Sequence, residues 1–219
     1  MDLLKFSQFL EKACSDIEIT LSDQQIKSFY QLLTLYKKWS QRISLSSIHD
    51  EVEVIEKHFV DSLFGVSLLK QSDRLADIGS GAGFPGIPLK IVKNGIKLGL
   101  FERRAKKTTY LKHVVRTLNF TRTNVYEIDT NDSNFQEKTK ALDYNIIVIR
   151  GVHLTADLIK QLKGIFSQAV LYVYAGLQHP FQDKTLSHLP YKVAKEGFVN
   201  NMSRTIFSLD FSALALESL

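Results

Sequence analysis

A run of closely spaced glycines between residues 76 and 88 is the part of this sequence best suited to chemistry. The segment reads ADIGSGAGFPGIP. Glycine lets a backbone turn tightly and approach a ligand closely. A strand is predicted to end at Ile78 and a helix to begin near Pro85, so the loop lies at the carboxyl end of a strand. In open α/β sheets this edge is where nucleotide-like ligands bind.

The glycine spacing leaves two kinds of ligand open. Gly81 to Gly86 match the G-x-G-x-x-G pattern of dinucleotide-binding proteins, so a nicotinamide cofactor is one interpretation. The turn that follows the strand directly is instead formed by Gly79, Gly81 and Gly83. Phe84 then stands where the third dinucleotide glycine would be, which speaks against that interpretation.

Two acidic residues favour S-adenosylmethionine. Asp77 stands at the strand end, two residues before Gly79, and Glu102 ends the next predicted strand. A carboxylate beside the loop suits a ligand that carries a sulfonium and an amino group better than it suits a pyrophosphate. A carboxylate at the end of the second strand can accept hydrogen bonds from both ribose hydroxyls of an adenosine.

Alternating strands and helices must position these residues. From residue 72 onward short apolar runs alternate with amphipathic stretches, which is typical of a parallel sheet with helices on both faces. The predicted fold class is therefore α/β, a doubly wound, Rossmann-like sheet. The expected strands are 74–78, 97–102, 124–128, 144–149 and 169–174, with further strands possible at 191–195 and 204–209. The expected helices are 84–93, 104–118 and 154–166.

The N-terminal residues follow a different pattern. Apolar residues recur at helical spacing over residues 2–14, over a stretch that ends at Trp39, and over residues 50–69. Ser22 and Gln25 form a capping box that opens the second of these helices. The sequence thus predicts a helical extension at residues 1–70 and an α/β domain at residues 71–219.

Composition narrows the class of protein. Apolar residues make up 44% and charged residues 23% of the 219 residues, as in ordinary globular proteins. A single cysteine, Cys14, excludes a disulfide framework and a cysteine-rich zinc site, and no metal site is predicted. Neither a signal peptide nor an apolar run of about 18 residues is found, so a soluble cytoplasmic protein with no membrane partner is expected.

The net charge of +5 permits a polyanionic partner without establishing one. Basic residues crowd the stretch between residues 103 and 122, and a solvated helix face is the simpler interpretation of such a run. Its members are Arg103, Arg104, Lys106, Lys107, Lys112, Arg116 and Arg122.

Three segments together resemble the RsmG (GidB) family of bacterial methyltransferases. These are the glycine block at 76–88, HFVDSL at 58–63 and ERRAKKTTYL at 102–111. The resemblance covers about residues 30–210. It implies a class I S-adenosylmethionine-dependent methyltransferase fold and methylation of guanine N7 in the decoding-region loop of 16S ribosomal RNA, with the RNA or the small ribosomal subunit as partner.

The resemblance also implies roles for single residues. Gly79 and Phe84 match positions that contact S-adenosylmethionine, and Glu102 matches the acidic ribose ligand. Thr130 and Asn131 fall where the family places a residue pair against the adenine. Arg150 matches the arginine after the fourth strand, and with Asp77, Gly81 and Gly83 it completes the expected cofactor set. Lys106, Lys107 and Arg204 match basic positions that we assign to RNA phosphates.

The sequence departs from the family pattern at several positions. Residues 43–46 read ISLS where the family has an asparagine–leucine–threonine segment. Gly151 and Val152 follow Arg150 in place of alanine and phenylalanine. Ala175 replaces a lysine, and Asn131 replaces a common acidic residue. The cofactor side of the pattern is thus better kept than the RNA side.

Methylation of guanine N7 requires no proton transfer by the protein. Guanine N7 has a free lone pair and no proton to lose, so no general base is required. Catalysis then reduces to positioning the base against the methyl group and excluding water. His58 and Asp61, three residues apart on one helix face, are interpreted as a structural pair that packs a helix against the sheet.

Aromatic side chains can hold a base that has left its stack. Phe84, Tyr110 and Tyr174 are candidates by position, although core packing is the simpler interpretation of each. The alternatives that remain open are a methyltransferase for another RNA, a protein or a small molecule, an inactive RNA-binding module, and a nicotinamide-dependent oxidoreductase. A monomer is expected.

Overall fold

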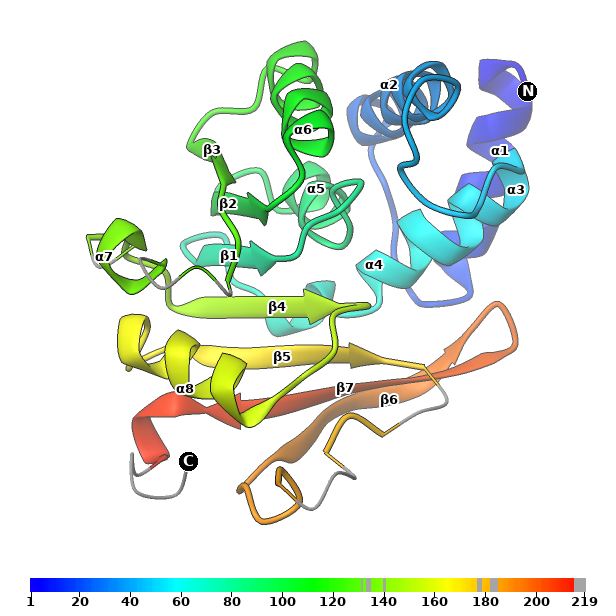
Figure 1. Ribbon diagram of the computed structural model, residues 1–219. Helices are drawn as coiled ribbons and strands as arrows, with labels where there is room; N and C mark the ends of the chain where they lie inside the picture. The colour runs from blue at the N-terminus through cyan, green and yellow to red at the C-terminus, as the bar shows by residue number, and fades with distance from the viewer. Residues whose placement is uncertain (131, 133–134, 140, 177–178, 182–184, 215–219) are drawn as a thin grey trace.

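The computed structural model describes residues 1–130, 132, 135–139, 141–176, 179–181 and 185–214, and Figure 1 shows their arrangement. A seven-stranded sheet has the strand order β3-β2-β1-β4-β5-β7-β6. Neighbouring strands are parallel except that β7 pairs antiparallel with β5 and β6. The predicted doubly wound α/β fold is therefore confirmed. The strands are β1 (Arg74–Ile78), β2 (Lys97–Glu102), β3 (Thr123–Glu127), β4 (Ile146–Arg150), β5 (Val170–Ala175), β6 (Lys192–Val199) and β7 (Met202–Asp210).

Helices cover both faces of the sheet. One face carries α5 (Gly86–Val92) and α6 (Ala105–Thr117), together with the N-terminal helices. The other face carries α7 (Phe135–Thr139) and α8 (Ala156–Ile165). The N-terminal helical segments are α1 (Leu3–Ser15), α2 (Asp23–Ser40), α3 (Glu51–Val54), the π-helix η1 (Ile55–Val60), α4 (Asp61–Leu63) and η2 (Val66–Leu68), and η3 (Phe211–Ala213) follows the last strand.

Successive side chains of the strands fill the hydrophobic clusters on the two faces of the sheet in turn. Leu98 and Leu100 of β2 belong to the hydrophobic cluster under α5 and α6, whereas Phe101 belongs to the cluster under α7 and α8. Successive side chains of a strand point to opposite faces of a sheet, so an apolar run of this kind fills both layers. The glycine loop thus leaves a strand that is buried on both sides.

The N-terminal helices share one core with the sheet. Phe29 and Tyr36 of α2 belong to the same buried cluster as Leu89 of α5 and Tyr110 of α6. Trp39 packs edge-on against Tyr110, with 5.8 Å between the ring centroids. The boundary at residue 70 therefore stays a prediction, because hydrophobic packing is continuous across it.

The start of α2 lies where the capping box predicted it. The backbone N–H of Gln25 donates to Ser22 Oγ at 3.3 Å, and the N–H of Ser22 donates to Gln25 Oε1 at 2.8 Å. Each bond satisfies an N–H group that the first turn of a helix would leave unpaired.

The third predicted helix is not regular. In place of one helix over residues 50–69, the structure has α3, the π-helix η1, α4 and the short 3₁₀-helix η2. A π-turn takes an extra residue into the turn. Here the Lys57 carbonyl accepts a hydrogen bond from Arg150 Nη1 at 3.2 Å, and His58 and Asp61 contact the same guanidinium. The helix continues without a gap from Glu51 to Leu63, and its hydrogen-bond pattern changes to a π-turn at the residues that bond a side chain from β4.

Tyr110 lies in the core, and its hydroxyl has no hydrogen-bond partner among the residues that the structure describes. A buried polar group left unpaired costs about 1–3 kcal/mol. We therefore expect Tyr110→Phe to raise the free energy of unfolding by about 1 kcal/mol and Tm by roughly 2–4 °C. Urea and thermal denaturation would measure both.

Tyr36→Phe is the matched control. The Tyr36 hydroxyl lies 2.7 Å from Ser46 Oγ and donates to the Ile48 carbonyl at 2.7 Å. Its removal should lower the free energy of unfolding by about 1–2 kcal/mol. Equal losses in both variants would contradict the assignment of Tyr110 to a purely apolar environment.

Candidate functional site

The glycine loop leaves β1 and is fastened to the end of β2. The backbone N–H groups of Gly79 and Ser80 both donate to the Phe101 carbonyl at 2.9 Å. Gly79, Gly81 and Gly83 have positive φ angles of 72°, 58° and 91°. A Cβ on Gly79 would lie 2.4 Å from Val152 Cγ2, whereas one on Gly81 would meet nothing closer than 3.8 Å. The loop therefore needs glycine at residue 79 for space as well as for backbone conformation.

Glu102 links the loop to the end of β2. Its carboxylate is buried, and it accepts hydrogen bonds from the Gly81 N–H at 3.0 Å and from the Arg104 N–H at 2.8 Å. The two bonds hold both carboxylate oxygens beside the loop. An acidic acceptor is thus fixed at the carboxyl end of the sheet, where the sequence predicted it.

A cavity of about 900 Å³ opens at this edge of the sheet, and we call it the first cavity. The predicted residues on its wall are Gly79, Gly81, Phe84, Glu102, Lys107, Thr130, Arg150 and Arg204. Asp77, Gly83 and Lys106 are not on its wall, and Asn131 lies outside the described residues. The volume lies within the range of small-molecule sites, roughly 300–1,000 Å³.

Asp77 supports the loop from behind. Its side chain is 1% exposed, and its Oδ2 accepts a hydrogen bond from the Gly86 N–H at 2.9 Å. Its Oδ1 has no hydrogen-bond partner among the described residues. Burial raises the pKa of this carboxyl to about 7. The sequence predicted direct contact with the ligand, whereas the observed contact joins the end of β1 to the start of α5.

Gly83 packs inward rather than toward the cavity. A Cβ on this residue would lie 2.2 Å from Ile87 Cδ1 and 3.1 Å from Leu111 Cδ2. Gly83 therefore allows the loop to approach α5 and α6. Lys106 lies on the exposed face of α6, away from the wall of the first cavity.

Phe84 forms an apolar part of the wall. Its ring stacks on the His58 imidazole with 4.6 Å between centroids and 17° between planes. The Arg150 guanidinium lies 5.5 Å from the centre of the same ring. Stacking and cation–π contacts of this kind hold a planar side chain in one orientation. Phe84 is only 5% exposed, so most of it packs in the core although it lines the cavity.

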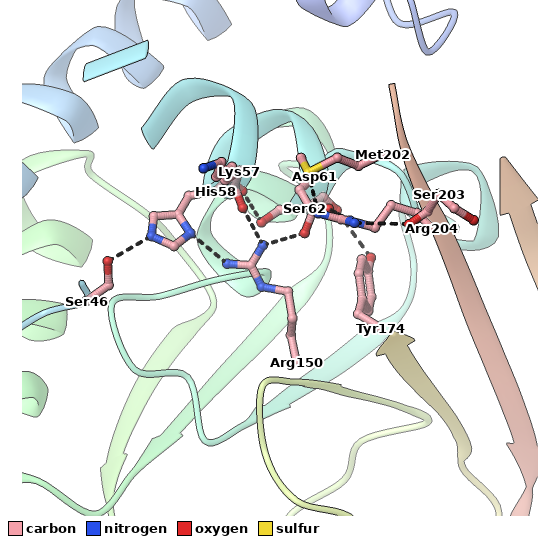
Figure 2. Close-up of polar contacts among 10 residues, drawn as sticks. All are labelled: Ser46, Lys57, His58, Asp61, Ser62, Arg150, Tyr174, Met202, Ser203 and Arg204. Carbon is pink, nitrogen blue, oxygen red and sulfur yellow. Dashed lines mark hydrogen bonds and ion pairs between the residues drawn. The ribbon is translucent and has the colours of Figure 1, made fainter. Parts of the chain in front are cut away.

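Arg150, the last residue of β4, is held from three sides (Figure 2). It donates to Asp61 Oδ2 at 2.8 Å, to the Lys57 carbonyl at 3.2 Å and to His58 Nδ1 at 3.2 Å. Because a guanidinium can only donate, His58 Nδ1 is an acceptor and its Nε2 carries the hydrogen. His58 Nε2 then donates to Ser46 Oγ, with 3.0 Å between the two atoms.

His58 is therefore a neutral connector. Burial, and then the charge of Arg150, lower the pKa of His58 to about 4. The predicted pairing of His58 with Asp61 is replaced by a shared contact, because each of them bonds the Arg150 guanidinium.

Two residues from neighbouring strands reach the same helical segment. Arg204 of β7 forms an ion pair with Asp61 through its Nε, and Tyr174 of β5 donates to the Ser62 carbonyl at 3.2 Å. Arg204 also donates to the Ser203 carbonyl at 3.0 Å. Its guanidinium is thus largely engaged within the protein (Figure 2).

Lys107 connects α6 to the N-terminal part of the chain. Its Nζ donates to the Leu45 carbonyl at 2.9 Å, and burial lowers the pKa of its ammonium. Leu45, Ser46 and Ile48 also line the first cavity. Sequence reasoning did not assign these residues to the site, although the departure at residues 43–46 marked the segment.

A second cavity of about 610 Å³ adjoins the first. Its other walls include Phe64, Tyr174, Ala175 and His179. The residues that line both cavities are Asp61, Arg150, Gly151, Val152, His153 and Arg204. Asp61 and the two arginines that bond it therefore belong to the wall that the two cavities share.

The described part of the chain contains no cluster of three or more histidine, cysteine, aspartate or glutamate side chains able to hold a metal ion. Within the same residues, no helix has both the length and the hydropathy that crossing a membrane requires.

Comparisons with known proteins point to one family. The family model described as GidB, rRNA small subunit methyltransferase G, matches residues 22–201. The protein of that name from Acetivibrio thermocellus is 35% identical over 142 residues, which are 64% of this chain and 57% of the relative. The one from Dictyoglomus thermophilum is 38% identical over 115 residues, 52% of this chain and 48% of the relative. The chain thus spans about half the length of these curated relatives.

A solved structure shares the fold at low sequence identity. A SAM-dependent methyltransferase from Aquifex aeolicus superposes with a TM-score of 0.52 and 16% identity, and the match covers 71% of this chain and 92% of the other. The likeness supports the arrangement of the sheet and its helices.

Proposed function

Because this chain belongs to the GidB family of rRNA small subunit methyltransferases G, we propose that it transfers a methyl group from S-adenosylmethionine to N7 of a guanine in the decoding-region loop of 16S ribosomal RNA. One observation carries the proposal: the first cavity joins the glycine loop, Glu102 and Arg150 at the carboxyl edge of the sheet. This is the edge at which open α/β sheets bind ligands.

The residues present fit S-adenosylmethionine. Gly79 and Gly81 lie on the cavity wall without side chains, and a Cβ on Gly81 would make only ordinary van der Waals contacts, 3.8 Å from the Gly79 carbonyl oxygen and 3.9 Å from Lys107 Nζ. Glu102 offers carboxylate oxygens suited to ribose hydroxyls, and Thr130 lies on the same wall. When bound, S-adenosylmethionine supplies a methyl group activated by its sulfonium. Asn131 stays a proposed neighbour of the adenine.

The second cavity is our proposed place for the acceptor base. It shares the wall of Arg150 and Arg204 with the first cavity, and Phe64, Tyr174 and Ala175 give it apolar surface. A base that leaves its stack is held by such surfaces. Guanine N7 attacks with its own lone pair, so the protein orients the base and excludes water. No side chain has to remove a proton.

The basic residues divide into two groups. Arg204 and Lys107 are engaged in contacts within the protein, while Lys106 is exposed on α6. We propose that Lys106 contacts RNA phosphates and that Lys107 and Arg204 act mainly through the shape and charge of the cavities. We further propose that the protein is a monomer, is located in the cytoplasm and has no membrane partner.

The nicotinamide alternative is disfavoured by the sheet. The dinucleotide-binding fold has the strand order 3-2-1-4-5-6. This sheet instead places the antiparallel strand β7 between β5 and β6. An inactive RNA-binding module, and a methyltransferase for another RNA, a protein or a small molecule, remain outcomes of the experiment below.

The experiment is transfer of radiolabelled methyl from S-adenosylmethionine to small ribosomal subunits from cells that lack this protein. Label recovered as N7-methylguanine in the 16S RNA is expected. Binding of S-adenosylmethionine without label in that RNA would direct the search to other acceptors or to an inactive module. Absence of both label and donor binding would refute the proposal.

Glu102→Ala should separate donor binding from methyl transfer. Loss of a charged hydrogen-bond acceptor removes about 2 kcal/mol, so the Kd for S-adenosylmethionine should rise about 30-fold. The rate at saturating donor should fall much less. Calorimetry and initial-rate assays would measure the two effects.

Glu127→Ala is the matched control for this prediction. Glu127 stands opposite Glu102 in the register of β3 and β2, and it accepts a hydrogen bond from Thr108 Oγ1 at 2.8 Å. It is absent from the wall of the first cavity. The affinity of Glu127→Ala for S-adenosylmethionine should stay within twofold of wild type. An equal loss of affinity in Glu102→Ala and Glu127→Ala would argue against the role given to Glu102.

A further inference from the structure

Three adjacent strands contact one short helical segment. Arg150 of β4 bonds Asp61, Tyr174 of β5 bonds the Ser62 carbonyl, and Arg204 of β7 bonds Asp61. Figure 2 shows these side chains converging on α4. Because β5 lies between β4 and β7 in the sheet, the segment lies across the edge of all three strands.

Asp61 is the shared acceptor of this arrangement. Its side chain is 9% exposed, its Oδ2 bonds Arg150, and its Oδ1 bonds Arg204. With His58 neutral, the cluster holds two guanidinium charges and one carboxylate. A carboxylate that receives charge-assisted bonds from two guanidiniums fixes the position of both.

The position of Asp61 gives it a bearing on the reaction. Asp61, Arg150 and Arg204 each line both the first and the second cavity. Positive charge moves from sulfur to guanine during methyl transfer. A guanidinium that swung freely into either space would raise the energy of these cationic species, since charges in a partly buried site are weakly screened.

We propose that Asp61 is a positioning residue for methyl transfer, an inference that rests on the function proposed above. It holds Arg150 and Arg204 in the wall between the two cavities, and it cancels one of their charges. The remaining positive charge is thereby kept in the wall, where it attracts RNA phosphate without entering the space of the reacting atoms. Asp61 acts through the two arginines and does not itself contact the base.

The substitution Asp61→Asn tests the proposal, because it keeps the shape of the side chain and removes the charge. The single-turnover rate of methyl transfer to small ribosomal subunits should fall about 30-fold at saturating S-adenosylmethionine. Affinity for the same RNA should rise about threefold at 0.1 M salt, because the cluster gains one net positive charge. Asp61→Glu, which restores the charge, should recover part of the rate.

The opposite movement of rate and RNA affinity separates this role from simple support of the fold. A cluster that merely collapsed would lose rate and affinity together. Asp16→Asn, at the exposed C-cap of α1, is the charge-matched control and should keep the wild-type rate. A rate within threefold of wild type in Asp61→Asn, or a parallel loss of rate and RNA affinity, would overturn the proposal.

A double variant and the activity of the wild-type chain provide two further measurements of the role of Asp61. If Asp61→Asn does not fold, as judged by circular dichroism, the double variant Asp61→Asn with Arg204→Gln removes the repulsion between the two guanidiniums. It should still be slow because Arg150 has lost its carboxylate, and a wild-type rate would overturn the inference. If the wild-type chain itself transfers no methyl group, the proposed function fails and this inference fails with it.

Discussion

Gly79→Ala is expected to weaken the binding of S-adenosylmethionine several hundredfold. The new methyl group would lie 2.4 Å from Val152 Cγ2, and residue 79 has a φ of +72°. Overpacking costs about 1–3 kcal/mol, and a left-handed conformation costs roughly 1–2 kcal/mol for a residue with a Cβ. The loop must shift to relieve both, which displaces the wall of the first cavity. Isothermal calorimetry would measure the change in Kd.

Gly81→Ala separates the two contributions. This glycine has a φ of +58°, yet a Cβ on it would have no neighbour closer than 3.8 Å. Only the conformational term of roughly 1–2 kcal/mol remains, so the Kd should rise about tenfold. If Gly81→Ala were as damaging as Gly79→Ala, contact with Val152 would not be the cause.

The second large effect concerns Asp77 and the pH dependence of stability. The pKa of this carboxyl is raised by burial from 3.8 to about 7 in the folded protein. The protonated carboxyl contributes to the free energy of unfolding. This contribution is fully present below pH 3.8 and is lost as the pH rises through about 7. At ~1.4 kcal/mol for each pKa unit, ionisation costs about 4 kcal/mol of folding free energy.

Asp77→Asn should remove this dependence. The difference in free energy of unfolding between the variant and wild type should grow by about 4 kcal/mol in favour of the variant from pH 4 to pH 7.5. Urea denaturation at several pH values, without any ligand, would measure it. If the free energy of unfolding had the same pH dependence in both proteins, ionisation of Asp77 would not destabilise the folded state and the prediction would be wrong.

Local patterns in the sequence predicted much of the fold. The strands that end at Ile78 and Glu102 begin and end at the predicted residues. Their runs of buried apolar residues are bounded by glycine or by charged residues. The strand ending at Asp210 extends beyond its predicted bounds at both ends. Its antiparallel direction was not predicted, because direction depends on pairing with β5 and not on the local pattern.

The candidate site was predictable where a motif is local. The glycine loop and Glu102 meet at the cavity because consecutive parallel strands end at the same edge of the sheet. The roles of Lys107 and Arg204 depend on partners far away in the sequence, Leu45 and Asp61. No local spacing reveals such contacts, so the sequence led only to the assignment of both residues to RNA phosphates.

The π-turn in the third predicted helix also depends on a partner far away in the sequence. Its apolar spacing fits a regular helix, and the π-turn at Ile55–Val60 coincides with bonds from Arg150, which lies about ninety positions later. The residues that sequence analysis treated as a structural pair, His58 and Asp61, therefore connect the N-terminal helices to the sheet.

The continuous core beneath the N-terminal helices has a consequence for the order of folding during synthesis. Phe29 and Tyr36 leave the ribosome early, yet they pack in one cluster with Leu89 and Tyr110. At about 5–20 residues per second, the roughly 70 residues between α2 and the middle of α6 take about 4–14 seconds to make. During that time the nascent helices expose their apolar faces. We therefore expect the N-terminal helices, which are made before α5 and α6, to reach their final packing only after α6 has been made.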